Sequence, residues 1–220
     1  HKAALSLSWD DNDIQIGTFA VVMDSASFQV QGKITPVGNY PLQLTTSLKT
    51  LSADLPSLTI KGTCDGDLRK LRVRGDIRGD AAIDLDITLQ EIIRNLRWQG
   101  DISIIELRPA VFAPDIPGTL TGSLITSGTL KHAEVTSTLS IRDPKAVEAN
   151  WDVDMDIRAN LESLIFDIKQ LDLRHANTAA VLKLTGVADI EQNLDLALHW
   201  KKLQWPMSGA ADYTSQQGDA

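Results

Sequence analysis

The sequence has a single cysteine, few aromatic residues and no long apolar run. Because Cys64 has no partner, no disulfide can form within the chain, and cysteine content says nothing about the redox compartment. No apolar stretch approaches the roughly 20 residues that a membrane-spanning helix needs. Aromatic residues make up only 5% of the chain, so its apolar content is mostly aliphatic. This composition suits a long aliphatic surface better than a compact core built on large rings.

The sequence also lacks an excess of positive charge. Its 21 lysines and arginines are outnumbered by 29 aspartates and glutamates, which gives a net charge of −8. Sequence-independent binding to nucleic acid needs a basic surface that displaces counterions, and charge-driven docking on an anionic membrane needs one too. We therefore expect no nucleic-acid partner. The hydrophobic content of 43% is typical of a folded chain rather than a disordered one.

No group of residues indicates catalysis or metal binding. The chain has no glycine-rich phosphate loop, no G-x-S-x-G element and no paired-carboxylate signature. Asp10, Asp11 and Asp13 lack the glycine and the distal glutamate of a calcium loop, so a solvated turn is the better interpretation. Cys64 occupies an apolar position, which favours a buried structural residue over a nucleophile. The sequence therefore predicts no enzyme activity, no metal and no cofactor.

The abundant feature is strict alternation of apolar and polar residues, clearest between Leu71 and Leu89. Ile83, Leu85 and Ile87 alternate with aspartates and a threonine, and the residues from Leu71 to Ile77 alternate with charged ones. Successive side chains of a strand point to opposite faces, so the pattern predicts two strands with one aliphatic and one charged face each. A helix would spread both sets around its circumference.

The same alternation recurs along the chain and predicts a dozen or more strands. Four of them carry an apolar-x-apolar-x-Gly-x-apolar motif, at 28–34, 58–64, 71–77 and 182–188, where glycine predicts a bend or a bulge. Residues 90–98 break the pattern and suit one or two helical turns or a bulged strand, whereas 107–117, with three prolines, predicts a loop. So many strands exclude βαβ architectures. Periodicity alone does not decide whether the apolar faces bury one another or line a groove.

A specific string appears near the C-terminus, where residues 198–209 read LHWKKLQWPMSG. It resembles the repeated L-x-W-x-x-L-x-W-P-L-x-G element of the TamB family, within the AsmA-like and bridge-like lipid-transfer group, with Met207 in place of a leucine. Residues 98–118, a W-x-G strand followed by a proline-rich link, are also similar to that family. The resemblance is specific from Trp98 onward. The part before Trp98 resembles the family only in its general pattern.

The resemblance implies an all-β fold, an elongated curled sheet of the β-taco type with an apolar concave interior. Residues 1–220 would be an internal fragment of one repeat-like domain without a second domain, in the periplasm of a Gram-negative bacterium and part of an inner-membrane-anchored protein. The implied function is a conduit whose groove shields phospholipid acyl chains between the inner and outer membranes. The implied protein partner is an outer-membrane barrel protein of the Omp85 family, reached through a region outside this fragment.

On this hypothesis the functional residues form a lining rather than a catalytic site. The expected lining residues are Leu71, Val73, Ile77, Ile83, Leu85, Ile87, Val153, Met155, Ile157, Leu182, Leu184, Leu194, Leu196 and Leu198. One alternative is a chaperone-like scaffold for outer-membrane protein and autotransporter assembly, in which an open sheet edge pairs with incoming strands. A third possibility is a structural spacer with a closed, dry core.

Overall fold

The computed structural model describes residues 2–10, 12–52, 55–112, 118–143, 150–189, 194–205 and 213–219. These residues form fifteen β-strands and one short 3-10 helix, η1 (Pro109–Val111). The strands are β1 (Lys2–Trp9), β2 (Ile14–Val22), β3 (Ala26–Ile34), β4 (Leu42–Thr50), β5 (Leu58–Gly66), β6 (Lys70–Gly79), β7 (Ala81–Gln90), β8 (Arg97–Leu107), β9 (Thr119–Thr129), β10 (His132–Arg142), β11 (Trp151–Asn160), β12 (Ile165–His175), β13 (Val181–Asp189), β14 (Leu194–Trp205) and β15 (Tyr213–Asp219).

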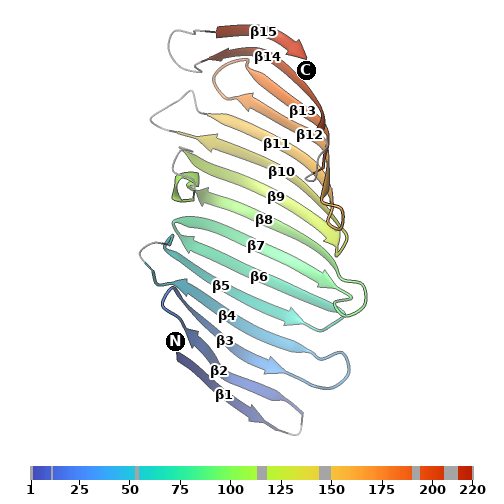
Figure 1. Cartoon of the computed structure of the whole chain (residues 1–220). Helices are drawn as coiled ribbons and strands as arrows, with labels where there is room; N and C mark the ends of the chain where they lie inside the picture. Colours follow the sequence, from blue (N-terminus) through green and yellow to red (C-terminus); the bar gives the residue numbers. More distant parts are fainter. Residues whose placement is uncertain are drawn as a thin grey trace. The chain divides into compact units, whose positions relative to one another are not determined.

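The strands lie in the sheet in the order in which they occur in the chain (Figure 1). The pairs from β1 to β7 and from β9 to β15 are antiparallel. Because β1 and β15 stand at the two ends of the order, the sheet is open rather than closed into a barrel. The described residues contain no α-helix. The predicted all-β fold class is thus confirmed, down to the two strands predicted between Leu71 and Leu89.

The chain divides into two compact units, His1–Ile102 and Ser103–Ala220. Unit 1 contains β1 to β7 and the first part of β8, and unit 2 contains the rest of β8 and β9 to β15. Each unit carries its own run of antiparallel hairpins. That residues 1–220 act as one domain stays a prediction.

Two stretches that interrupt the alternation form connections. Residues 91–96 make a turn in which the backbone N–H groups of Arg94 and Asn95 both donate to the Glu91 carbonyl, at 3.1 and 3.0 Å. The bond from Asn95 closes one helical turn that does not continue, and β8 begins at Arg97. The predicted loop at 107–117 contains η1, and its residues 113–117 lie outside the described ones.

The recurrent glycine has a backbone explanation at Gly32 and Gly186. Their φ angles are 147° and 132°, in a region that residues with a Cβ rarely adopt. Each faces a bulge, because the register of β2 shifts between Ile16 and Phe19 and that of β12 shifts between Ile168 and Leu171. The predicted association of glycine with bulges is confirmed at these two positions. By contrast, Gly62 and Gly75 face each other in unbroken register.

Gly32→Ala is expected to lower the free energy of unfolding by about 1–3 kcal/mol, since alanine would be strained at this φ. An added Cβ would also lie only 2.0 Å from the Gln43 carbonyl oxygen. The matched control is Gly75→Ala, where the backbone is not left-handed and the nearest atom, the Lys61 carbonyl oxygen, is 3.1 Å away. Urea denaturation measures both variants. Equal losses in the two would contradict this account of Gly32.

Candidate functional site

Cross-strand register gathers the apolar residues of unit 1 on one side of the sheet. Directly paired residues of antiparallel strands share a face, so the register defines the set. We call it apolar face 1. It comprises Leu5, Leu7, Trp9, Ile14, Ile16, Phe19, Val21, Phe28, Val30, Ile34, Leu42, Leu44, Leu48, Leu58, Ile60, Cys64, Leu71, Val73, Ile77, Ile83, Leu85, Ile87 and Leu89. The face runs across all seven strands from β1 to β7, with Thr46 and Thr50 of β4 as polar residues in its rows.

Unit 2 has an equivalent surface, apolar face 2, on β9 to β14. It comprises Leu120, Leu124, Val135, Leu139, Ile141, Trp151, Val153, Met155, Ile157, Phe166, Ile168, Leu171, Leu173, Leu182, Leu184, Leu194, Leu196, Leu198 and Trp200. Three polar side chains stand in its rows, because Ser137 pairs with Leu124 and Met155, Thr126 pairs with Val135, and His175 pairs with Trp151. The buried Ser137 hydroxyl has no hydrogen-bond partner within the part of the chain that the structure describes.

The fourteen residues predicted to line a groove all belong to these two faces. Six lie together on β6 and β7, where Val73 pairs with Ile87 and Ile77 with Ile83. The other eight lie on β11, β13 and β14 of unit 2. Sequence reasoning omitted β12, which joins β11 to β13 and adds Leu171 and Leu173. It also omitted β1 to β5 and β9 to β10, although the same alternation was present there.

The apolar faces are only partly buried: Leu5, Leu7, Trp9 and Leu194 are exposed, and the other members are half-buried. Among the described residues only Ala81, Ile104 and Ala180 are buried apolar residues, and no large side chain is fully buried. The accessible surface is 13869 Å². A compact protein of the same 24.0 kDa mass would expose roughly 9,900 Å² by the usual size scaling. The excess is what a sheet without a second layer produces, because both of its faces meet solvent.

The opposite side of the sheet in unit 1 is charged, and its charges are paired across strands. Arg72 binds Asp86, Arg78 binds Asp84, and Arg74 lies 3.1 Å from Asp65. The hydrogen bond from Arg72 is the main cause that lowers the pKa of the Asp86 carboxyl below its ordinary value. Exposed pairs of this kind add little stability, but they keep this side hydrated.

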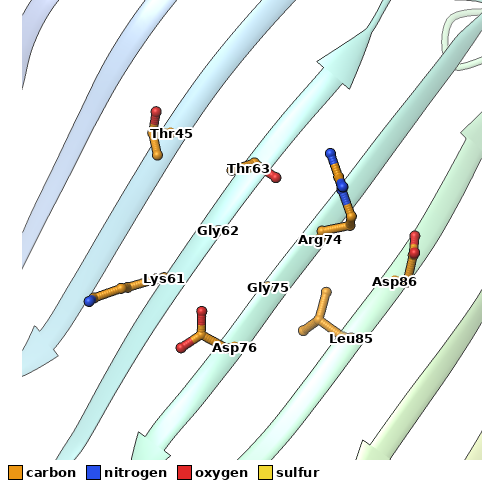
Figure 2. Close-up of a pocket in the computed structure, with 9 residues that line it drawn as sticks. All are labelled: Thr45, Lys61, Gly62, Thr63, Arg74, Gly75, Asp76, Leu85 and Asp86. Carbon is orange, nitrogen blue, oxygen red and sulfur yellow. The ribbon is translucent and has the colours of Figure 1, made fainter.

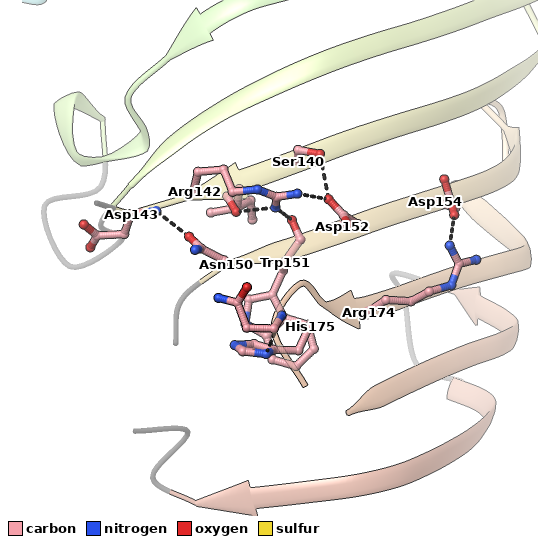
Figure 3. Close-up of polar contacts among 11 residues, drawn as sticks. Ser140, Arg142, Asp143, Asn150, Trp151, Asp152, Asp154, Arg174 and His175 are labelled. Atoms are coloured by element: carbon pink, nitrogen blue, oxygen red, sulfur yellow. Dashed lines mark hydrogen bonds and ion pairs between the residues drawn. The ribbon is translucent and has the colours of Figure 1, made fainter. Parts of the chain in front are cut away.

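Unit 2 repeats the arrangement on β10 to β12 (Figure 3). Arg174 lies 2.7 Å from Asp154, and Arg142 binds both Asp152 and the carbonyl oxygen of Trp151. A hydrogen bond from Ser140 Oγ, 2.7 Å long, is the largest cause of the lowered pKa of Asp152, followed by the bond from Arg142. Both units therefore have one aliphatic and one charged face.

A hollow of about 540 Å³ lies on the charged side of unit 1 (Figure 2). Its polar side chains come from β4 to β7, and they are Thr45, Lys61, Thr63, Arg74, Asp76 and Asp86. Gly62, Gly75 and Leu85 lie between them, and by register these three belong to the apolar side. Cations and anions alternate around the hollow, and Arg74 already has a carboxylate partner. This arrangement resembles a solvated surface more than a catalytic centre.

The aspartates near the first turn are engaged by the protein itself. Asp10 Oδ1 accepts the backbone N–H groups of Asn12 and Asp13, at 3.0 and 2.8 Å. The predicted turn is present, since the Asp10 backbone N–H donates to the Asp13 carbonyl at 3.0 Å. Within it the Asp13 carboxylate is not simply solvated, because it lies 2.6 Å from Lys33 Nζ and accepts a 2.6 Å hydrogen bond from Thr35. The Asp11 part of that prediction lies outside the described residues. No group of three or more potential ligands in the described segments is arranged around a metal position.

Cys64 is half-buried on apolar face 1 rather than fully buried as predicted. Cys64 does occupy an apolar position, as the alternation predicted, because it pairs with Leu44 and Val73. The difference arises because no second layer covers the face. Burial, and then the neighbouring charge of Asp65, raises the pKa of the Cys64 thiol.

Residues 1–96 match the family model described as TamB, N-terminal domain. The N-terminal part of the chain, 96 of its 220 residues, is therefore similar to the N-terminal domain of TamB. The match covers β1 to β7 and ends just before β8. It therefore lies in the part of the chain whose sequence shows only a general resemblance to the family, and not in the part that carries the specific motifs. No match was found among curated proteins or among solved structures.

This match supports a function related to that of TamB in the bacterial envelope. Among the helices of the described residues, none has the length and apolar character of a membrane span.

The native cysteine offers a direct test of apolar face 1. Because the thiolate is the reactive form, a raised pKa leaves less of it at pH 8, and Cys64 is expected to react with iodoacetamide more slowly than an exposed thiol. The rate of alkylation should continue to increase at pH values above the ordinary thiol pKa. A variant with Cys64→Ser and Thr63→Cys moves the thiol to the charged side and serves as the control. Equal rate–pH profiles for both would show that Cys64 is not shielded.

Proposed function

We propose that the apolar faces of this chain shield phospholipid acyl chains as lipids move through the periplasm between the inner and outer membranes. The observation that carries the proposal is the apolar face that spans seven successive strands of unit 1, whose side chains are half-buried or exposed. Soluble proteins rarely expose contiguous apolar patches larger than a few hundred Å² unless something binds there. In this proposal the acyl chain is the occupant of the face.

Geometry and energetics favour an acyl chain. Neighbouring strands lie about 4.8 Å apart, so the six spacings from β1 to β7 give a face about 29 Å long across the strands. Each methylene exposed to water costs about 0.8 kcal/mol, so a chain of about 15 methylenes leaving a membrane would lose roughly 12 kcal/mol. A surface that offers aliphatic contact along its whole length offsets most of this cost at every position.

The chemistry of the face favours movement over tight binding. Its members are almost all aliphatic, and in unit 1 no charged side chain belongs to the register rows of the face. A ligand held only by dispersion and burial has no directional bond to break when it shifts by one strand. The ion-paired opposite side keeps the segment hydrated while the apolar side is in use. The segment requires no cofactor, no enzymatic step and no nucleic acid.

Photo-crosslinking tests the proposal. A photoreactive amino acid is placed at Leu85, on apolar face 1, and separately at Asp84, its neighbour on the charged side, in cells labelled with radioactive phosphate. Phospholipid adducts are expected at position 85 and not at position 84, because adjacent residues of a strand face opposite sides. Adducts at neither position in a folded protein, or at both equally, would contradict the proposal.

A further inference from the structure

Three turns of unit 1 are joined to one another at one end of the strands. They connect β3 to β4, β5 to β6 and β7 to β8. The backbone N–H of Leu68 donates to the Asn39 carbonyl at 3.0 Å, and that of Ile92 donates to the Leu68 carbonyl at 3.1 Å. Glu91 N–H donates to the Arg69 carbonyl at 2.8 Å. The three turns therefore form one hydrogen-bonded platform, although they are far apart in the sequence.

This platform encloses a hollow of about 380 Å³. The side chains that matter for its chemistry are Tyr40, Leu68, Arg69, Glu91, Ile93 and Arg94. Two arginines, one glutamate and one tyrosine therefore line it together with two aliphatic residues. Ile93 is 74% exposed and Tyr40 is 47% exposed, so apolar groups here meet water.

The two arginines of the hollow differ from those of the charged side. Arg72, Arg74 and Arg78 each bind a carboxylate of a neighbouring strand. Arg69 and Arg94 form no ion pair with any carboxylate of the described residues. The nearby Asp67 carboxylate accepts the backbone N–H groups of Arg69 and Lys70, at 2.8 and 2.9 Å, and so closes its own turn. The charge of Arg69 is the least of the causes that lower the pKa of the Asp67 carboxyl, and both arginines of the hollow remain outside ion-pair distance of every described carboxylate.

The backbone at the hollow is held in an uncommon conformation. Tyr40 and Glu91 have φ angles of 57° and 50°, in the left-handed region that residues other than glycine seldom occupy. The surrounding hydrogen bonds keep both residues there. Tyr40 and Glu91 therefore occupy turn positions at which glycine would be less strained.

The hollow lies directly beyond the end of apolar face 1. The last apolar pair of β6 and β7 is Leu71 with Leu89, and the next backbone bond outward joins Arg69 and Glu91 of the hollow. A ligand with a charged head in the hollow could therefore extend an apolar tail along the face. That combination of charge and apolar tail is the chemistry of a phospholipid.

We propose that this hollow binds the phosphoethanolamine headgroup of a phospholipid whose acyl chains lie on apolar face 1, an inference that rests on the proposed function. Arg69 and Arg94 would hold the phosphodiester, since guanidinium groups bind phosphate oxygens through charge-assisted hydrogen bonds. The Glu91 carboxylate would pair with the ammonium of the headgroup. Tyr40 adds a phenolic donor to the same cluster.

Calorimetry on the full chain tests the site, with dihexanoyl phosphatidylethanolamine, dihexanoyl phosphatidylglycerol, glycerophosphoethanolamine and inorganic phosphate as probes. Arg69→Gln and Arg94→Gln are each expected to weaken phosphatidylethanolamine binding roughly tenfold. Arg97→Gln, which removes an exposed arginine on β8 outside the hollow, is the matched control and should change nothing. Glu91→Gln should weaken the binding of phosphatidylethanolamine and leave the binding of phosphatidylglycerol unchanged, because only phosphatidylethanolamine carries an ammonium group.

The probes separate the two proposals. Lipid binding that survives both arginine variants would overturn the headgroup site and leave the acyl-chain face standing. Glycerophosphoethanolamine binding that is lost in Arg69→Gln, with no added affinity from acyl chains, would support the headgroup site and count against the conduit. Inorganic phosphate bound as tightly as the lipid would overturn the assignment of a lipid headgroup.

Discussion

The rest of the structure depends on cross-strand register. A slip of one residue would exchange the two sides of a strand and place charges on the apolar face. The two bulges show how closely sequence and register agree. Ile16 and Phe19 are three residues apart, as are Ile168 and Leu171, yet each pair stays on one face because the bulge absorbs the extra residue. The alternation in the sequence shifts its phase at those positions, and Gly32 and Gly186 face the shifts.

This register produces a sheet without a conventional core. Stability must come from backbone pairing and from neighbouring side chains on each face, because only Ala81, Ile104 and Ala180 are buried apolar residues in the described part of the chain. On the charged side, arginines of β6 each pair with an aspartate of the neighbouring strand. On the apolar side, contact between rows is only partial, so surface remains available to a ligand. The same absence of a second layer therefore explains the half-buried Cys64 and the proposed function.

The sequence predicted most of the strands and the face of each expected lining residue, because a period of two is a local signal. It did not reveal β15, whose residues Tyr213–Asp219 show little alternation, or the division into two units. The hollow at Arg69 and Arg94 was also missed, since it depends on three turns that meet only through long-range hydrogen bonds. Gly62 and Gly75 carry the same motif as Gly32 but adopt no left-handed backbone, so the motif alone did not distinguish bulge from straight strand.

The central claim is that apolar face 1 is open and receives acyl chains. The most direct measurement is spin-label accessibility at Cys64, compared with a label on the charged side at position 63 in a Cys64→Ser, Thr63→Cys variant. On addition of phospholipid, collisions of the Cys64 label with a water-soluble nickel complex should fall and those with oxygen should rise, while the label at position 63 stays unchanged. An unchanged label at Cys64, or the same change at both positions, would contradict the claim.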